Sequence, residues 1–411
     1  MAGQAPPRTI AIAGGSLAGL SAAEELRAQG FGESIIVVGR EPEMPYDRPP
    51  LSKQMLKGEM AADALALACK PDMDITWRLG KSATGLDVGA RTLTLDDGES
   101  LAFDGLVIAT GASPRRLPFG GLAGMHVLRT RQDAEQLKAD LDRQPARVVV
   151  IGGGFIGAEI AATCRALNIA VTIVEPLPGL LIRALGPMVS ELVGNIHRDQ
   201  GVELRTGTQA FDALADGAGR VRAIRLSDGT EIETDVVVVA VGVVPETHWL
   251  EGSGLDISDG VLCDATCLAA PGIAAAGDIA RWPNTRFDEC RRVEHWDNAI
   301  QQGRYAARRL LADESATTEP YTPVPWVWSD QFGLKLQVYG STVLHDELRF
   351  VDGPTDDHKF VALYRRGGRL AGVAGIGKVR SLLGYRRMLE AGTSWDDATS
   401  ATSASAQGTA Q

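Results

Sequence analysis

Two glycine-rich turns are the residues of this 411-residue chain best suited to chemistry. GGSLAG at 14–19 follows the apolar run TIAIA at 9–13, and GGGFIG at 152–157 follows VVVI at 148–151. Each opens onto an alanine-rich stretch typical of a helix. A helix that begins directly after a strand points unpaired N–H groups and its positive dipole end at a bound pyrophosphate. With the late AAAGD at 274–278, the two turns predict two bound dinucleotides and electron transfer between FAD and a nicotinamide.

The glycine places of the two turns are filled differently. The second turn fills all three places of G-x-G-x-x-G, with Gly152, Gly154 and Gly157. In the first turn Gly14 and Gly19 fill the outer places and Ser16 the middle one, where its hydroxyl could donate to a phosphate. Glycine lets the backbone approach a pyrophosphate and lets the helix pack close to its strand. One such turn could be only a tight strand–helix corner, whereas two in the same context favour nucleotide binding.

Further apolar runs place these turns within two strand–helix–strand units. The first unit continues with a strand at 34–38 and a strand at 101–109 that ends in ATGASP. The second continues with strands at 170–174 and 235–240. The Asp-Gly turn in SDG at 227–229 separates two apolar alternations and predicts a hairpin there. Alternating strands at 335–339 and 360–364 and a helix near 378–391 follow. This pattern predicts an α/β protein with two Rossmann-like domains, the NAD domain inserted in the FAD domain, and a C-terminal α+β domain.

The expected boundaries follow from this pattern and from prolines near 320–325. The FAD-binding domain is expected at 1–113 and 248–322, the NAD-binding domain at 114–247, and the C-terminal domain at 323–396. The small, polar segment 397–411 is expected to be a disordered tail.

Composition excludes several other classes of protein. A net charge of −11 argues against general nucleic-acid binding. No apolar run approaches the roughly 20 residues that span a bilayer, and the N-terminus lacks the layout of a signal peptide, so a cytoplasmic location is expected. The six histidines show no metal-binding spacing, and no metal is expected. The five cysteines are expected to be reduced, and MPYDRPPLSK carries none of the paired cysteines of disulfide-reducing flavoenzymes.

With these features in place, the chain resembles the oxygenase-coupled NADH-dependent ferredoxin reductases, which have a glutathione-reductase-like fold. The resemblance covers about residues 8–390. It is carried by PYDRPPLSK (45–53), ATGASPR (109–115), LRT (128–130), GGGFIGAEIAA (152–162), APGIAAAGDIA (270–280), VEHWDNAIQQG (293–303) and PWVWSDQFGLKLQVYG (325–340). It implies FAD and NADH as cofactors and a [2Fe–2S] ferredoxin as partner, which feeds a cytochrome P450 or a Rieske oxygenase.

The resemblance also implies roles for single residues. Lys53, paired with Glu159, is expected beside the flavin, where an ammonium stabilises charge on the reduced ring. Trp328 is expected near the flavin on the side of the iron–sulfur partner, and these three are the implied catalytic residues. Without the resemblance, a solvated lysine, an exposed helix carboxylate and a core tryptophan would be the simpler interpretations. The implied cofactor-binding set is Gly14, Ser16, Ala18, Gly19, Arg40, Glu41, Arg48, Pro49, Lys53, Ala83, Ala109, Thr110, Gly111, Arg129, Gly152, Gly154, Phe155, Ile156, Gly157, Glu159, Glu175, Arg183, Gly242, Gly277, Asp278, Glu294, His295 and Trp296.

The second strand of each strand–helix–strand unit ends in a different kind of residue. An acidic residue usually binds the FAD adenosine at the end of the second strand, but Arg40 stands there, with Glu41 next to it. An arginine has no acceptor for ribose hydroxyls, so either Glu41 takes this role or Arg40 meets adenine or phosphate. In the second unit Glu175 predicts NADH over NADPH, because a carboxylate there accepts the ribose 2′-hydroxyl and repels a 2′-phosphate. Arg183 leaves some NADPH use open.

Basic residues suggest where a partner would dock on this protein. The protein itself is expected to be a monomer or a homodimer. A chain of net negative charge carries Arg304, Arg308 and Arg309 on one predicted helix, and a run from 365 to 387 without Asp or Glu that contains Arg365, Arg366, Arg369, Lys378, Arg380, Arg386 and Arg387. These groups suit an acidic ferredoxin, unless they pair with acids of this chain. The alternative functions are an NADH oxidase or peroxidase, for which Ser52 is the nearest nucleophile-like residue, and a redox sensor similar to the apoptosis-inducing factor. No nucleic acid or membrane is expected as a partner.

Overall fold

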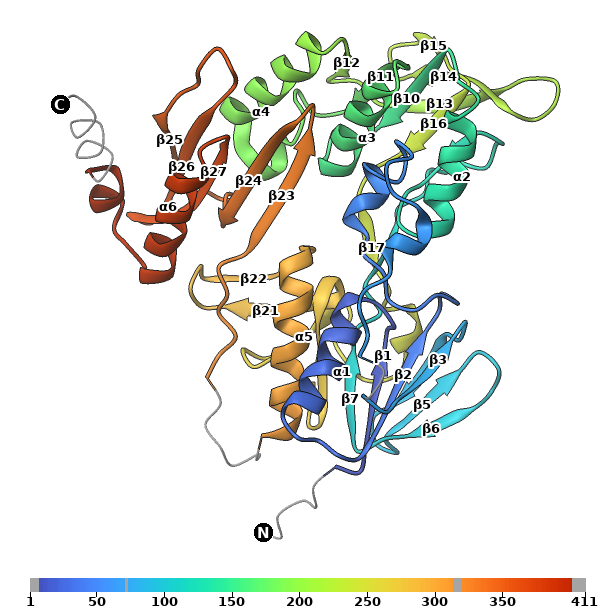
Figure 1. Ribbon diagram of the computed structural model, residues 1–411, viewed down its shortest axis with the longest axis vertical. Coiled ribbons are helices and arrows are strands. Elements are labelled where there is room, and N and C mark those ends of the chain that lie inside the picture. The colour runs from blue at the N-terminus through green and yellow to red at the C-terminus, as the bar shows by residue number, and fades with distance from the viewer. Residues whose placement is uncertain (1–6, 71–72, 313–318, 401–411) are drawn as a thin grey trace. The chain divides into compact units, whose positions relative to one another are not determined.

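The computed structural model describes residues 7–70, 73–312 and 319–400, which form two compact units (Figure 1). The first unit comprises the chain up to 47, 65–113 and 244–325, and the second comprises 48–64, 114–243 and the chain from 326 onward. Among the described residues, no helix has the length and apolar character needed to cross a bilayer.

A six-stranded sheet lies at the centre of the first unit, in the order β19-β20-β7-β1-β2-β3. Its pairs are parallel except for β19 with β20. The strands are β1 (Thr9–Ala13), β2 (Ser34–Gly39), β3 (Ile75–Leu79), β7 (Gly105–Ile108), β19 (Leu268–Ala270) and β20 (Ile273–Ala275). Strands β1 and β2 and the helix between them confirm the first predicted strand–turn–helix–strand.

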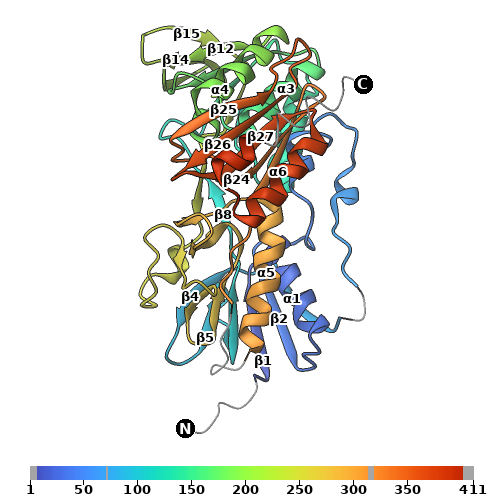
Figure 2. The same ribbon diagram turned by 90° about the vertical axis from the view of Figure 1, so that its left-hand side faces the viewer.

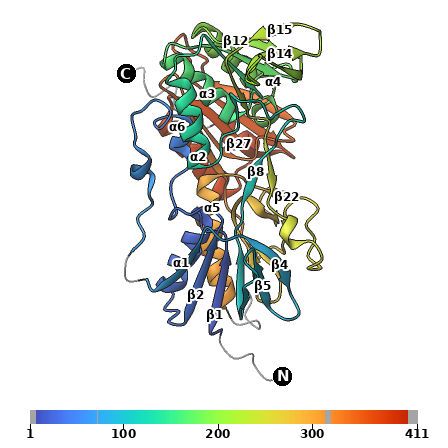
Figure 3. The ribbon, with the colours of Figure 1, turned by 90° about the vertical axis from the view of Figure 1, so that its right-hand side faces the viewer.

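Alternation along β1 builds a core on each face of this sheet. Ile10 and Ile12 pack with helices α1 (Leu17–Ala28) and α5 (Trp296–Leu311), whereas Ala11 and Ala13 pack with the opposite layer. That layer includes the antiparallel strands β4 (Ala83–Asp87), β5 (Thr92–Leu95) and β6 (Ser100–Ala102). Figure 3 shows α1 on one side of β1 and β2 and the strands β4 and β5 on the other. The first unit also contains β18 (Val261–Leu262), β21 (Ala280–Asn284) and β22 (Glu289–Arg292).

The second unit repeats the parallel arrangement in a five-stranded sheet, in the order β12-β11-β10-β16-β9. The antiparallel strands β13, β14 and β15 cover one face through Val149 and Ile151 of β10. The predicted hairpin is confirmed, with Gly229 at its turn (φ +86°). The elements are β9 (Met125–His126), β10 (Arg147–Ile151), β11 (Ala170–Glu175), β12 (Glu203–Thr206), β13 (Ala210–Ala215), β14 (Val221–Leu226), β15 (Glu231–Glu233), β16 (Val236–Val239), α2 (Arg131–Leu141), α3 (Phe155–Ala166) and α4 (Ile182–Asp199).

The C-terminal part of the second unit is an antiparallel five-stranded sheet, in the order β23-β24-β27-β26-β25. Its strands are β23 (Trp326–Gln331), β24 (Leu334–Gly340), β25 (Glu347–Asp352), β26 (Phe360–Arg366) and β27 (Arg369–Ile376). Helix α6 (Val379–Ala391) lies against β24 and β27 (Figure 2) and matches the predicted helix near 378–391. Two short strands, β8 (Ala112–Pro114) and β17 (Val243–Pro245), pair where the chain passes between the units.

Two sequence-based expectations need correction. The predicted strand at 101–109 is broken into β6 and β7, because the Asp104 carboxylate accepts the backbone N–H groups of Arg8 and Thr9 and turns the chain. The segment expected as a tail at 397–411 is helical up to residue 400. Buried Trp395 and Ala398 hold this last turn in place, and residues 401–411 lie outside the described part.

The close contact of α1 with α5 yields a stability prediction. A Cβ at Gly303 would lie 2.4 Å from the backbone oxygen of Ala18, so Gly303→Ala is expected to destabilise the protein by about 1–3 kcal/mol through overpacking. Gly384 in α6 is the matched control, because a Cβ there meets nothing within 4 Å, and an alanine should stabilise the helix by about 0.5–1 kcal/mol. Thermal unfolding measures both, and a Gly303→Ala protein as stable as the wild type would contradict the packing argument.

Candidate functional site

The turn after β1 holds two of its glycines against backbone oxygens. Gly14 has φ +128° and its N–H donates to the carbonyl oxygen of Val38 at 2.8 Å. A Cβ at Gly14 would lie 2.0 Å from the Ala109 oxygen, and one at Gly19 would lie 1.9 Å from the Gly14 oxygen. Both positions therefore require glycine, and the N-terminal N–H groups of α1 are left for an anion.

The two other predicted residues of this turn have different surroundings. Ser16 precedes α1 in an extended conformation, and its side chain does not cap the helix. Ala18 is buried, and its Cβ would lie 3.1 Å from a Cβ built at Gly277. Ala18 can therefore offer a ligand its backbone but not its side chain.

Residues at the end of β2 are held by neighbours within the first unit. Arg40, with 57% of its side chain exposed, pairs with Glu246 at 2.8 Å. Ser113 also donates to Glu246, and the Tyr46 hydroxyl donates to Glu41. The guanidinium of Arg40 is thus directed at a carboxylate, and Glu41 is the acidic group at the end of the strand.

The late Gly-Asp forms a second part of this surface. Gly277 has φ +77°, and its N–H donates to Gln302 Oε1 at 2.9 Å. Asp278 follows in a 3₁₀ turn at 277–279 and is half-buried. The neighbouring ATGASP turn is tied to the same unit, since Thr110 donates to the Glu246 backbone oxygen at 3.0 Å. Gly111 in this turn has φ +70°, and Ala83 begins β4 in the same unit.

The segment before α5 leaves a buried nitrogen unused. Trp296 Nε1 donates to Asp47 at 2.7 Å, and Glu294 pairs with Arg292 at 2.5 Å. His295 precedes the helix, and its Nδ1 atom is buried without a hydrogen-bond partner. Burial lowers the pKa of His295 to about 4, so its ring is neutral. His295 thus offers a ligand a neutral ring nitrogen, and Gly14 and Gly19 leave room for it to approach the backbone. These features fit a dinucleotide such as FAD.

The turn after β10 repeats the geometry of the first turn. Gly152 has φ +110° and donates to the Val174 oxygen at 2.8 Å. A Cβ at Gly152 would lie 2.3 Å from the Ala240 oxygen, and one at Gly157 would lie 2.0 Å from the Gly152 oxygen. Gly154 is exposed and a Cβ there would meet nothing, so its glycine leaves open space in front of α3. This turn fits the pyrophosphate of a second dinucleotide.

Glu175 braces this turn at the end of β11. Its Oε2 accepts the Gly153 N–H at 2.7 Å and its Oε1 accepts the Leu177 N–H at 2.9 Å. Ionised carboxylate oxygens have further lone pairs, so both can also accept from a ribose hydroxyl. Arg183 is exposed in the first turn of α4. Exposed positions near the same turn also include Ile156 and Gly242, with Phe155 half-buried.

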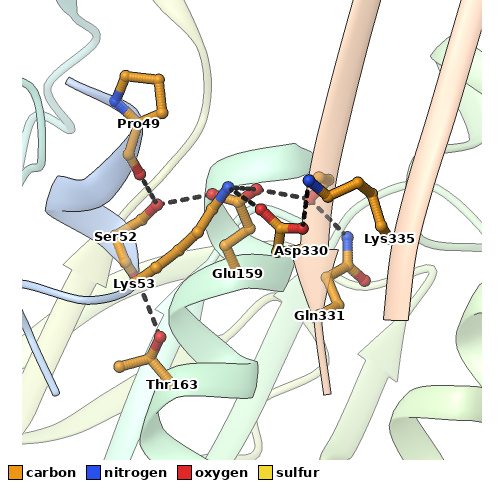
Figure 4. Close-up of polar contacts among 9 residues, drawn as sticks. Pro49, Ser52, Lys53, Glu159, Thr163, Asp330, Gln331 and Lys335 are labelled. Atoms are coloured by element: carbon orange, nitrogen blue, oxygen red, sulfur yellow. Dashed lines mark hydrogen bonds and ion pairs between the residues drawn. The ribbon is translucent and has the colours of Figure 1, made fainter. Parts of the chain in front are cut away.

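A buried ion pair joins two of the predicted catalytic residues (Figure 4). Lys53 Nζ lies 3.0 Å from Glu159 Oε1, and only 9% and 5% of the two side chains are exposed. The same ammonium lies 3.1 Å from Asp330 Oδ2, and the other oxygen of that carboxylate, Oδ1, lies 3.7 Å from Lys335 Nζ. The expectation of a lysine–glutamate pair is met, and it excludes a freely solvated lysine at position 53.

Hydroxyl groups complete the surroundings of Glu159. Ser52 donates to Glu159 Oε2 and a second serine, Ser329, donates to Oε1, both at 2.6 Å. The backbone oxygen of Ser52 accepts from Thr163 at 2.7 Å, which fixes the 48–64 segment to α3 (Figure 4). Every contact of the carboxylate therefore compensates the cost of burying its charge.

Aromatic rings border this cluster. Lys53 Nζ lies 5.8 Å from the centre of the Trp328 ring, within the range of a cation–π interaction. Trp328 stacks on Trp326, with ring centres 5.0 Å apart. Trp328 thus lies beside the ion pair of Lys53 and Glu159.

Three other predicted residues lie together in the second unit. Arg48 Nη1 donates to the backbone oxygen of Arg129 at 2.6 Å, and Pro49 begins the 3₁₀ turn that carries Ser52. The Arg129 N–H donates to Asp133 at 3.0 Å, beside the capping box of α2.

Sequence reasoning missed several residues linked to this cluster. They are Asp330, Ser329 and Thr163, then Gln331, which donates to Ser329, and His197, which contacts Gln331. They come from three segments far apart in the chain, so no spacing in the sequence relates them to Lys53. The only available signal was the match at PWVWSDQFGLKLQVYG, which contains SDQ.

All five cysteines are free thiols. Burial raises the pKa of Cys164 to about 12 and that of Cys263 to about 12. Burial also raises the pKa of Cys267 and of the half-buried Cys69. These four are poor nucleophiles, because the thiolate is the reactive form. Ser52 is the nucleophile-like residue of the 45–53 segment, and its hydroxyl donates a hydrogen bond to Glu159.

Several of the predicted docking cations pair with acids of this chain. The pairs include Arg308 with Glu25 at 2.9 Å and Arg365 with Asp346 at 2.6 Å. Lys378 and Arg386 pair with Asp352 and Glu390 in the same way. Arg380 and Arg387 are exposed on α6, where Val379 and Leu383 are also exposed, and Arg304 is exposed on α5. Because these four cations pair with acids, the positive charge of the basic group is smaller than the sequence indicates.

Two family profiles match the chain. Residues 8–303 match the pyridine nucleotide-disulphide oxidoreductase profile, and residues 326–406 match the reductase C-terminal profile. The former profile covers both glycine turns and the late Gly-Asp. The latter begins at β23, the strand that carries Trp328 and Asp330.

Individual relatives cover nearly the whole chain. The ferredoxin–NAD+ reductase component of the p-cumate 2,3-dioxygenase system of Pseudomonas putida is 40% identical over 80% of this chain and 81% of its own length. Rhodocoxin reductase of Rhodococcus erythropolis is 37% identical over 93% and 89%.

Solved structures agree with these matches. The reductase in the covalent putidaredoxin reductase–putidaredoxin complex has a TM-score of 0.87 and 32% identity, covering 93% of each chain. A ferredoxin reductase from Rhodopseudomonas palustris has a TM-score of 0.88 and 34% identity, covering 94% of this chain and 95% of its own. The chain therefore belongs to the pyridine nucleotide-disulphide oxidoreductase family and, within it, to the FAD- and NAD-dependent ferredoxin reductases of oxygenase systems.

Proposed function

We propose that this protein is an FAD-dependent NADH:ferredoxin oxidoreductase whose partner is an acidic [2Fe–2S] ferredoxin that feeds a cytochrome P450 or a Rieske oxygenase. The observation that carries the proposal is the presence of two dinucleotide turns of the same geometry on two separate parallel sheets. Relatives that share most of the chain are ferredoxin reductase components, which supports the choice of acceptor. We propose in addition that the protein works in the cytoplasm, where NADH is formed.

The residues divide the task between them. When bound, FAD accepts a hydride from NADH and releases single electrons to the iron–sulfur partner. The turn after β1, with Asp278 and Trp296, would hold FAD, and the turn after β10, with Glu175, would hold NADH. Lys53 would stabilise negative charge on the reduced flavin, and Glu159 would hold its ammonium in place.

The oxidase and peroxidase alternative is disfavoured because the segment that would carry its active-site cysteine has Ser52 instead, whose hydroxyl donates to Glu159. A redox sensor similar to the apoptosis-inducing factor would share the fold but would turn over NADH slowly. The two alternatives differ from the proposal in the fate of the electrons once the flavin is reduced.

Anaerobic mixing of the FAD-loaded protein with NADH tests the proposed function. We expect rapid bleaching of the flavin and fast reduction of an added [2Fe–2S] ferredoxin. Ferredoxin reduction should slow as salt rises, because exposed charges guide the encounter and salt screens them, whereas reduction of a small neutral acceptor should barely change. Bleaching without electron transfer, followed by peroxide formation in air, would support the oxidase, and a long-lived complex with slow turnover would support the sensor.

Glu175 yields a prediction about the nicotinamide. The wild-type protein should show a higher kcat/KM with NADH than with NADPH, because the carboxylate accepts the 2′-hydroxyl and repels a 2′-phosphate. Glu175→Gln should lower the ratio of the two kcat/KM values by about tenfold, the effect of losing one charged hydrogen bond. A wild-type preference for NADPH would contradict the assignment.

Lys53 and Lys335 provide a matched pair of variants. Lys53→Met is expected to slow flavin reduction by NADH by about 100-fold, the lower end of the loss when one charge-stabilising donor is removed. Lys335→Met removes a lysine from the other side of Asp330, where 55% of the side chain is exposed, and should stay close to wild type. Stopped-flow absorbance measures both rates on protein with bound FAD. Equal rates in Lys53→Met and wild type would remove Lys53 from the mechanism.

A further inference from the structure

A row of buried hydrogen bonds leads from Glu159 to a histidine that the proposed function does not use. Ser329 Oγ donates to Glu159 Oε1, and Gln331 Nε2 donates to Ser329 Oγ at 3.0 Å. His197 Nε2 lies 2.8 Å from Gln331 Oε1. Ser329 and His197 are fully buried and Gln331 is 6% exposed. Ser329 and Gln331 lie on the same face of β23 because alternate residues of a strand point the same way, and His197 belongs to the last turn of α4.

One direction of the hydrogen bonds in this row satisfies the carboxylate at its end. An ionised carboxylate only accepts, so the Ser329 proton is committed to Glu159. Ser329 Oγ then accepts from the amide nitrogen of Gln331, which turns the amide oxygen toward His197. Because an amide oxygen also only accepts, the proton of the imidazole must be on Nε2.

The other ring nitrogen confirms that this proton is the only one. His197 Nδ1 is buried and has no hydrogen-bond partner, and the ring meets Phe332 edge to face at 4.9 Å. A second proton would place a charge in this apolar setting, and burial lowers the pKa of His197 to about 4 despite the bond to Gln331. The histidine is thus a neutral donor with one usable N–H.

The N–H donor of His197 selects one of two orientations of the Gln331 amide, and with it the direction of the hydrogen bonds in the row. The amide of Gln331 can be reversed with almost no change of shape, so packing does not choose its orientation. In the reversed state its oxygen would face Ser329, which could donate there and leave Glu159 one hydrogen bond short. Lys53 lies 3.0 Å from Glu159 and 3.1 Å from Asp330, so weaker holding of Glu159 would move the ammonium toward Asp330.

We propose that His197 is a positioning residue for the reaction, which fixes the amide of Gln331 and thereby keeps Ser329 donating to Glu159 and Lys53 in its place. The proposal rests on the proposed function, in which Lys53 stabilises charge on the reduced flavin. His197 itself touches neither dinucleotide in this scheme.

Three variants isolate the N–H from the packing of the ring. His197→Phe keeps a ring and removes the donor, and His197→Gln places an amide N–H near the position of Nε2. Phe332→Leu is the matched control, because it removes the ring contact but leaves the bond from His197 to Gln331 intact. Stopped-flow absorbance gives the limiting rate of flavin reduction and the Kd for NADH, and thermal unfolding gives Tm.

We expect His197→Phe to lower the limiting rate by about tenfold, equal to about 1.4 kcal/mol in the barrier, with an unchanged Kd for NADH. His197→Gln should restore most of the rate, and Phe332→Leu should keep it even where its Tm falls. Nitrogen NMR of the ring, with and without FAD, should show a proton on Nε2 and none on Nδ1 from about pH 5 to about pH 8.

Other results would overturn the proposal. A proton on Nδ1 would do so, as would a His197→Phe protein as fast as wild type or no slower than Phe332→Leu. Should His197→Phe fail to fold, His197→Gln is compared with the shorter His197→Asn, because only glutamine reaches Gln331. Equal rates of flavin reduction in these two variants would contradict the positioning role of His197. A wild-type protein that NADH does not reduce would contradict the proposed function instead, and the NMR result would still test the hydrogen-bond direction.

Discussion

The burial of one carboxylate, that of Glu159, sets the requirements for much of the second unit. A charge removed from water must be compensated, and here an ammonium and two serine hydroxyls do so. These groups come from the 48–64 segment and from β23, so the carboxylate ties both to α3. The same three segments carry the second glycine turn, Lys53 and Trp328. A single electrostatic requirement therefore brings together these three segments of the second unit.

The two glycine turns show how one backbone solution serves two ligands. In both, the first glycine lies against a carbonyl oxygen of a neighbouring strand end, and the last lies against the oxygen of the first. The strand ends beside them are different, because Glu175 binds its own turn whereas Arg40 binds Glu246. The two turns therefore share their backbone geometry and differ in the side chain at the strand end.

The sequence predicted those features that depend on local pattern. The strands and helices around both turns and the hairpin at Gly229 follow from apolar alternation and glycine placement. The break at Asp104 was missed because its cause is a side-chain hydrogen bond to residues almost a hundred positions away. The cluster around Glu159 could be found only as the pair that the family resemblance implied. Ser329, Gln331 and His197 join it through tertiary packing, which leaves no periodic trace in the chain.

The chain order of the first unit has a consequence for how the protein is made. Strands β1, β2, β3 and β7 are complete by residue 108, but β20, which pairs with β7, begins at residue 273 and α5, which covers the core beside α1, begins at residue 296. During synthesis the early strands must therefore wait, with an open edge and an uncovered apolar face, while more than a hundred residues of the second unit emerge. Exposed edges of this kind invite aggregation. Slow translation or a lack of chaperones should thus lower the yield of this protein through its first unit, whose early strands leave the ribosome first but whose sheet is completed only after residue 273.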